Sequence, residues 1–260
     1  MTSCSKPVYT PEFYEGQLTA SYKSARRYAS ELLTLYKPSS IIDVGCGTGA
    51  WLKAFGELCP ARLVGVDGCW NKQANMIDEN IEFFERDLDS PRTLSGFGTE
   101  RFDLAMSLEV AEHLKETSAD QFVESLTNLS DSVLFGAAYT KQGGTNHINE
   151  QPHTYWAVKF KERDYLPFDL FREKFWGDSQ ISFWYQQNTF LYVQKSSPLF
   201  MILDASGIRP LVNLNFLNCI HPQLYQLRTN PDPFLKSSLR KIVPRRLKNI
   251  LKKIGSSLVN

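Results

Sequence analysis

A chain of 260 residues is long enough for one α/β domain with an added segment, and 42% hydrophobic and 22% charged residues are typical of globular proteins. This composition excludes a disordered or fibrous chain. No stretch reaches the roughly eighteen apolar residues that a membrane span needs, and the first thirty residues do not resemble a signal peptide. We therefore expect a cytoplasmic protein.

The charge is distributed unevenly along the chain. The net charge is +1, but residues 234–260 contain eight Lys/Arg and no acidic residue, which leaves 21 basic and 28 acidic side chains in the first 233 residues. An acidic main part disfavours a nucleic-acid partner, because duplex-binding surfaces are basic. Residues 245–258 combine an apolar stripe with a basic face, which predicts either peripheral contact with the inner face of the membrane or docking on the acidic part.

Helical and strand patterns alternate along the first half of the chain. Residues 20–36 carry apolar side chains at helical spacing, and residues 119–129 do the same. Strands joined by such helices form βαβ units and a parallel sheet. The sequence therefore predicts an α/β fold with a Rossmann-like, doubly wound, mostly parallel seven-stranded sheet. The segments that read as strands are residues 41–44, 63–66, 81–84, 102–107, 133–135 and 189–193.

The pattern changes after residue 138. A polar loop is followed by a helical stretch and then by an aromatic-rich run, so we expect residues 139–188 to form a cap insertion. Aromatic side chains in this run, Tyr185 among them, are expected to pack in the core. The predicted domains are residues 1–205, which include the cap, and a C-terminal extension, residues 206–260, which ends in the basic helix.

A glycine-rich turn follows the first predicted strand. The residues DVGCGTG (43–49) close this strand and open a helix, and glycines there let the backbone turn sharply and approach a ligand. The free N–H groups at the start of the helix face the ligand's polar groups. Asp67 ends the second strand, where a carboxylate can accept hydrogen bonds from ribose hydroxyls. The sequence therefore predicts a cofactor that contains a nucleoside.

Two cofactors fit this turn, because GCGTGA also satisfies the GxGxxG/A pattern of nicotinamide-binding folds. S-adenosylmethionine (SAM) is favoured by Asp43 before the first glycine, by Asp87 after the third strand, and by Glu109 after the fourth. In this order the elements resemble the successive motifs of class I methyltransferases. The resemblance implies that SAM is bound by Asp43, Gly45, Cys46, Gly47, Gly49, Asp67, Gly68, Asp87, Leu88, Leu108 and Glu109.

Three further stretches extend the resemblance. SLEVAEHL (107–114), QGGTNHINEQPHTYW (142–156) and WYQQN (184–188) resemble a bacterial methyltransferase family associated with glycan and cell-surface polysaccharide biosynthesis. This resemblance implies O-methylation of a sugar hydroxyl or a related small acceptor. The residues themselves leave open N- or C-methylation of another metabolite, and also a catalytically silent SAM-fold module in a biosynthetic complex.

The loop after the fifth strand contains the candidate catalytic residues. Loops at the carboxyl ends of parallel strands face the ligand crevice, and this loop contains His147, Glu150 and His153. An oxygen acceptor must lose its proton during methyl transfer, and a histidine can accept that proton or orient the acceptor. The alternative is a structural polar loop in which His147 caps backbone groups.

A metal site is the second interpretation of this region. Glu109, Glu112 and His113 form an ExxEH pattern, and His147 could complete a set of ligands for magnesium or manganese. Many methyltransferases with a similar pattern show no metal, so the sequence-based expectation is that no metal binds and that activity survives chelation.

Overall fold

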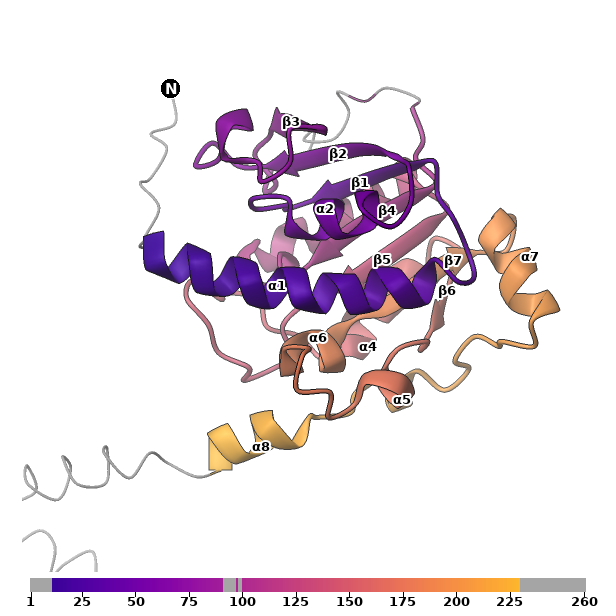
Figure 1. Cartoon of the computed structure of the whole chain (residues 1–260). Helices are drawn as coiled ribbons and strands as arrows, with labels where there is room; N and C mark the ends of the chain where they lie inside the picture. Colours follow the sequence, from indigo (N-terminus) through magenta and orange to yellow (C-terminus); the bar gives the residue numbers. More distant parts are fainter. Residues whose placement is uncertain (1–10, 91–96, 98–99, 230–260) are drawn as a thin grey trace, which may run out of the picture. The chain divides into compact units, whose positions relative to one another are not determined.

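The computed structural model describes residues 11–90, 97 and 100–229. A seven-stranded sheet with the strand order β3-β2-β1-β4-β5-β7-β6 forms its centre (Figure 1). The predicted α/β fold with a mostly parallel sheet is confirmed. The strands are β1 (Ser40–Val44), β2 (Arg62–Asp67), β3 (Ile81–Glu85), β4 (Leu104–Leu108), β5 (Ser132–Gly136), β6 (Tyr165–Phe168) and β7 (Phe190–Gln194). The helices are α1 (Pro11–Leu32), α2 (Ala50–Gly56), α3 (Ala119–Leu129), α4 (His153–Lys161), α5 (Arg172–Phe175), α6 (Phe183–Asn188), α7 (Pro198–Ala205) and α8 (Pro222–Thr229).

The strand order reverses at β1, which lies between β2 and β4. All pairs among β1 to β5 are parallel, whereas β7 runs antiparallel to both β5 and β6. In doubly wound sheets a ligand binds beyond the carboxyl ends of the strands at such a reversal. The topology therefore places the binding crevice where β1 and β4 end.

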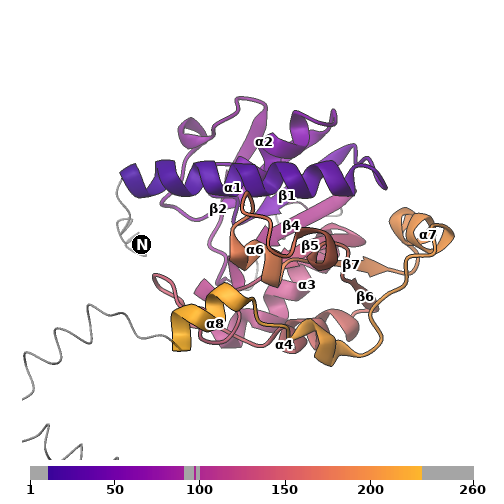
Figure 2. The same cartoon turned by 60° about the horizontal axis from the view of Figure 1, so that its bottom comes forward.

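Alternating side chains of the buried strands supply two separate cores. Ile41 packs with residues of α1 and α2 on one face of the sheet, and the next residue, Ile42, packs with residues of α3 and α4 on the other. Figures 1 and 2 show α1 crossing one face while α3 and α4 lie on the opposite face. β1 is buried on both faces of the sheet, which explains its almost entirely apolar sequence. That sequence therefore predicted the strand correctly.

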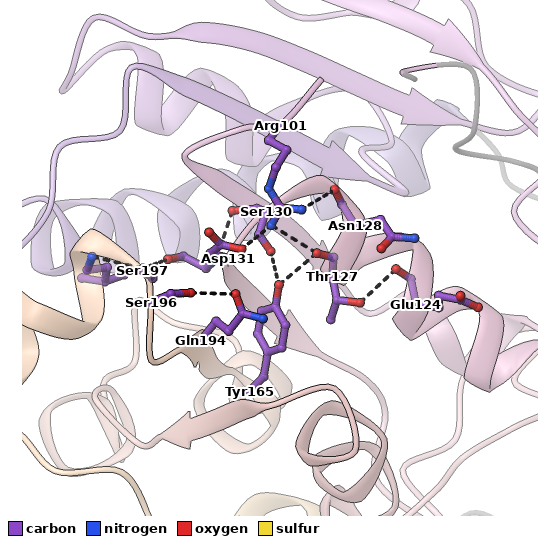
Figure 3. Close-up of polar contacts among 12 residues, drawn as sticks. Arg101, Glu124, Thr127, Asn128, Ser130, Asp131, Tyr165, Gln194, Ser196 and Ser197 are labelled. Carbon is purple, nitrogen blue, oxygen red and sulfur yellow. Dashed lines mark hydrogen bonds and ion pairs between the residues drawn. The ribbon is translucent and has the colours of Figure 1, made fainter. Parts of the chain in front are cut away.

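The segment predicted to be a cap is in part a component of the sheet. β6 is the edge strand, and it lies within residues 139–188. The short sequence YLPF hides this strand because proline is rare in strands, but an edge strand tolerates it. Tyr165 fixes β6 in place, since its hydroxyl lies 2.9 Å from the carbonyl oxygen of Thr127 and 2.6 Å from that of Ser130 (Figure 3).

The C-terminal part divides near residue 221. The chain forms two compact units, Met1–His221 and Pro222–Asn260, and α8 is the described element of the second. The predicted domain boundary at residue 205 stays a prediction, and the predicted basic helix at residues 245–258 lies outside the described residues. Among the described helices, none combines the length and the apolar character that crossing a bilayer requires.

Candidate functional site

The turn between β1 and α2 has a backbone that only glycine adopts readily. Gly45, Gly47 and Gly49 have φ angles of 87°, 54° and 86°. A Cβ atom on Gly45 would lie 2.3 Å from Cγ2 of Val110, and one on Gly49 would lie 2.6 Å from Cδ1 of Ile81. The turn therefore requires glycine both for its conformation and for its close packing.

Asp67, at the end of β2, holds this turn from the side. Its carboxylate accepts one hydrogen bond from the backbone N–H of Gly47 and one from that of Gly68, both at 2.7 Å. The side chain of Asn71 donates to the carbonyl oxygen of Gly47. Burial raises the pKa of Asp67, and the two backbone hydrogen bonds oppose this rise. The predicted ribose acceptor is thus buried and fixed against the glycine turn.

A cavity of about 150 Å³ opens beside the glycine turn. Side chains from α1 and α6 also line it, and among them Ser21 Oγ and Tyr185 Oη lie 3.1 Å apart. The Trp51 ring meets the Tyr185 ring edge-on, with 5.1 Å between centroids. The residues lining the cavity are Ser21, Asp43, Gly45, Cys46, Gly47, Thr48, Ala50, Trp51, Leu108, Glu109 and Tyr185.

Two carboxyl groups face this cavity from β1 and from the end of β4. Burial raises the pKa of Asp43 to about 8, and the neighbouring charge of Asp67 adds to the rise. Glu109 has a φ of 58°, which is costly for a residue with a side chain. Burial raises its pKa to about 7, although hydrogen bonds from Asn188 and Gln142 oppose the rise. Both groups favour a cationic ligand, which would stabilise their ionised forms.

Glu109 belongs to a buried network of side-chain amides. Its carboxylate accepts hydrogen bonds from Gln142 Nε2 at 2.6 Å and from Asn188 Nδ2 at 2.7 Å. Asn188 Oδ1 lies 3.0 Å from Nε2 of His153, whose Nδ1 lies 2.8 Å from the carbonyl oxygen of Leu217. Burial lowers the pKa of His153 to about 4. Because both its ring nitrogens contact buried protein atoms, we drop His153 from the residues that we expect to act on the acceptor.

The other two candidate catalytic residues lie together. Nδ1 of His147 is 2.8 Å from Oε1 of Glu150, which also accepts a hydrogen bond from the backbone N–H of Gly143. On the far side of the ring, Nε2 of His147 is 4.0 Å from Oε1 of Glu112. The residues after β5 are tied to those after β4, because the backbone N–H groups of Ile148 and Asn149 both donate to the carbonyl oxygen of Glu112.

Of the eleven residues expected to bind the cofactor, six line the cavity, three lie in or beside the glycine turn, and two lie at neither place. Asp43, Gly45, Cys46, Gly47, Leu108 and Glu109 line the cavity, and Gly49, Asp67 and Gly68 support the turn. Asp87 is exposed after β3, and Leu88 lines a separate small hollow of about 10 Å³ with residues of α3 and the turn before it. Their predicted contact with the cofactor stays a prediction.

Sequence reasoning missed several residues of the site. Ser21 and Tyr185 come from segments far from the glycine turn, and no local pattern joins them. Tyr185 was expected in the core, and it does pack there while also lining the cavity. Gln142 and Asn188 lie in two stretches that carry the family resemblance, but their contacts with Glu109 were not predicted. In the sequence, only the resemblance of these two stretches to the methyltransferase family pointed to Gln142 and Asn188.

A protein-family model matches the part of the chain that contains the glycine turn. Residues 14–133 match a family model described as a methyltransferase domain. This match covers the glycine turn, Asp67 and Glu109, and it ends before the loop that contains His147. No curated protein sequence matches the chain.

Solved structures share the fold at low sequence identity. An O-methyltransferase family protein from Burkholderia thailandensis superposes with a TM-score of 0.54 at 15% identity, covering 72% of this chain and 60% of its own. The proposed methyltransferase in a complex with the Haloferax volcanii Trm112 activator gives 0.52 at 13% identity, covering 70% and 94%. A proposed O-methyltransferase from Nostoc punctiforme gives 0.51 at 10% identity, covering 74% and 63%. This chain therefore has the fold of these methyltransferases and spans 60% of the length of the Burkholderia protein.

Proposed function

We propose that this chain, whose residues 14–133 match a methyltransferase domain, binds SAM and transfers its methyl group to a hydroxyl oxygen of a small acceptor. The observation that carries this proposal is the pairing of His147 with Glu150 on the loop after β5. That loop also supplies Gln142, which contacts Glu109 at the wall of the cofactor cavity. A histidine held by a carboxylate beside a cofactor cavity is suited to acting on a hydroxyl group.

The residues around the glycine turn fit the parts of SAM, which supplies an electrophilic methyl group when it is bound. Asp67 is buried against the turn and retains lone pairs for ribose hydroxyls. Asp43 and Glu109 line the cavity with two carboxyl groups, and SAM carries both a sulfonium and an amino cation. A nicotinamide dinucleotide offers a pyrophosphate instead, which two facing carboxyl groups would repel.

The transfer itself is an in-line displacement at the methyl carbon. The acceptor oxygen forms a bond to this carbon, and the carbon–sulfur bond breaks with its electron pair remaining on sulfur. The hydroxyl proton leaves the acceptor during the same event, so alignment and proton removal are the two tasks of the protein. The loop that contains His147 is the part of the chain placed for the second task.

The proposed acceptor is a sugar hydroxyl of a nucleotide-linked or lipid-linked glycan. Support comes from the family resemblance of residues 107–114, 142–156 and 184–188. The polar side chains Gln142, His147 and Glu150 add hydrogen-bonding groups of the kind that bind hydroxylated ligands. N- or C-methylation is the competing activity, and no contact among the described residues favours it.

An acceptor screen tests the proposal. The purified protein is incubated with methyl-labelled SAM and with nucleotide sugars, lipid-linked glycans, amines and activated carbon acids. We expect label in a hydroxylated acceptor and loss of the reaction when the methylated hydroxyl is replaced by hydrogen. Label found only in amine or carbon acceptors would replace O-methylation by the competing activity.

The raised pKa of Asp43 makes cofactor binding depend on pH. Below about pH 8 this carboxyl group is mostly protonated in the free protein, and its ionised form is the one that attracts a cation. Ionisation of Asp43 on SAM binding should therefore release a proton, and this group by itself should make the affinity rise with pH by at most about tenfold per unit, levelling off above about pH 8. Calorimetry in two buffers with different ionisation enthalpies measures the released proton directly.

The matched variant for this test is Asp43→Asn, which keeps the shape of the side chain. Glu109 also titrates in this cavity, with a pKa of about 7, so it contributes its own pH dependence in both proteins. The difference between the wild type and Asp43→Asn isolates Asp43. Equal proton release by the two proteins would show that Asp43 does not ionise on binding.

A further inference from the structure

Glu112 has an unusual environment for a carboxylate. Its side chain is 0% exposed, and neither carboxylate oxygen accepts a hydrogen bond from the described residues. The backbone amides of Glu112 and Ala138 favour the ionised carboxylate, but neither of them meets hydrogen-bond geometry with its oxygens. An ionised carboxylate buried in this way is costly, and a cation bound beside it would offset the cost.

Two histidines flank this carboxylate. Nδ1 of His113 lies 3.3 Å from the carbonyl oxygen of Asn146, and Nδ1 of His147 lies 2.8 Å from Oε1 of Glu150. Because each Nδ1 faces an oxygen, the proton of each neutral ring belongs on Nδ1, and the lone pair is on Nε2. The rings meet edge to face, with 4.8 Å between centroids.

The ligand atoms of these three residues converge. One carboxylate oxygen of Glu112 and one ring nitrogen from each histidine all lie within 4.8 Å of one another. An ionised carboxylate and two ring lone pairs at this range would together attract a positive charge between them. Hydrogen bonds from Ile148 and Asn149 to the carbonyl oxygen of Glu112 hold the two contributing segments together.

We propose that Glu112, His113 and His147 bind a divalent transition-metal ion such as Mn²⁺, Fe²⁺ or Co²⁺. Two imidazoles and one carboxylate suit these ions better than Mg²⁺, which prefers an all-oxygen environment. The fourth residue of the sequence-based metal alternative, Glu109, is not among the converging ligands, and its oxygens accept hydrogen bonds from Gln142 and Asn188 instead. The proposal replaces the expectation from sequence that no metal binds.

Glu150 acts in this site as a positioning residue. A histidine that binds a metal usually donates its other N–H to a carboxylate or carbonyl oxygen, which fixes the orientation of the ring. Glu150 has this relation to His147, and the carbonyl oxygen of Asn146 has it to His113. Asn146 has a φ of 62°, so the loop adopts a costly conformation where it supplies this carbonyl oxygen.

The consequence for methyl transfer rests on the proposed function. Three protein ligands leave coordination positions open, as in catalytic metal sites. An ion there would lower the pKa of an acceptor hydroxyl group, so that its proton passes to water while the oxygen attacks the methyl carbon. His147 would then act on the acceptor through the ion that it holds.

The test is direct metal binding by the full-length protein. The wild type is stripped with EDTA, dialysed, and titrated with Mn²⁺ while electron paramagnetic resonance measures the free ion. We expect saturable binding of one ion per chain. Glu112→Gln, which keeps the side-chain shape, should weaken binding by more than about 100-fold, and Glu150→Gln by about 10–100-fold, the range for residues that orient metal ligands.

Glu124→Gln is the matched control, because this glutamate is exposed on α3 outside the cluster. The Mn²⁺ affinity of this variant should equal that of the wild type. A Co²⁺ absorption spectrum of the wild type should show nitrogen ligation that is lost in His147→Gln. Thermal melts establish that each variant is folded. The proposal is overturned if the folded wild type binds neither Mn²⁺ nor Co²⁺ saturably, or if Glu112→Gln binds them equally well.

The two proposals fail in distinguishable ways. Saturable binding without methylation of any hydroxyl acceptor would keep the metal site and remove the proposed function. Methylation of a hydroxyl acceptor by stripped protein that binds no metal would keep the proposed function and remove the metal site.

Discussion

Replacement of His147 by alanine should lower the rate of methyl transfer by roughly 10²–10⁴-fold, the range for loss of a group that acts on the acceptor proton. Affinity for SAM should barely change, because His147 does not line the cofactor cavity. The melting temperature should change little, because the partly buried side chain makes one hydrogen bond to the described residues, with Glu150 on the same loop. Single-turnover kinetics at saturating SAM, with a thermal melt, measure these quantities.

His153→Ala is the matched comparison, since it removes a histidine from the same segment of chain. Its ring contacts Asn188 and the carbonyl oxygen of Leu217 in the buried interior. Removal should cost about 1–3 kcal/mol for each buried group left without a partner. We expect a lower melting temperature with a rate close to normal well below that temperature. If His147→Ala also showed a lower melting temperature and a near-normal rate, the proposed role of His147 would be wrong.

Asp67→Ala should weaken binding of both SAM and its demethylated product by more than tenfold. The substitution removes the predicted ribose acceptor and also leaves the backbone N–H groups of Gly47 and Gly68 without their partner. Both effects act on the cofactor and its product alike, because the two molecules differ only at sulfur. Isothermal calorimetry gives both dissociation constants.

Asp204→Ala controls for the loss of one negative charge. Asp204 is exposed on α7 and pairs with Arg209, away from the residues that line the cavity. Its affinity for SAM should match that of the wild type. An unchanged affinity in folded Asp67→Ala would mean that Asp67 supports the turn without contacting the ribose.

The parts of the fold that could be predicted are those with a local signal. β1, β2 and β5 are buried on both faces, so their apolar runs were visible, and α3 was predicted with its observed bounds. β6 was missed because an edge strand needs only a short, weak pattern, and its position depends on pairing with β7 and on the Tyr165 hydroxyl. Such contacts link residues far apart in the sequence.

The same distinction between local sequence signals and long-range contacts applies to the candidate site. The glycine turn could be predicted from the sequence because each of its glycines has a positive φ, which other residues rarely adopt. The acceptor side has no comparable constraint. Whether Glu109 or Glu112 faces His147 depends on the strained φ of Glu109 and on hydrogen bonds from Asn188 and Gln142, which the spacing ExxEH does not reveal. The structure was needed to separate the two glutamates.

Calorimetric titration of the wild-type protein with SAM tests the central claim most directly. The cavity beside the glycine turn, with Asp43, Asp67 and Glu109, predicts one SAM bound per chain with a dissociation constant on the order of micromolar. NADH, titrated under the same conditions, should give no saturable heat. Tight binding of NADH by a protein that does not respond to SAM would contradict the assignment of this chain as a SAM-dependent methyltransferase.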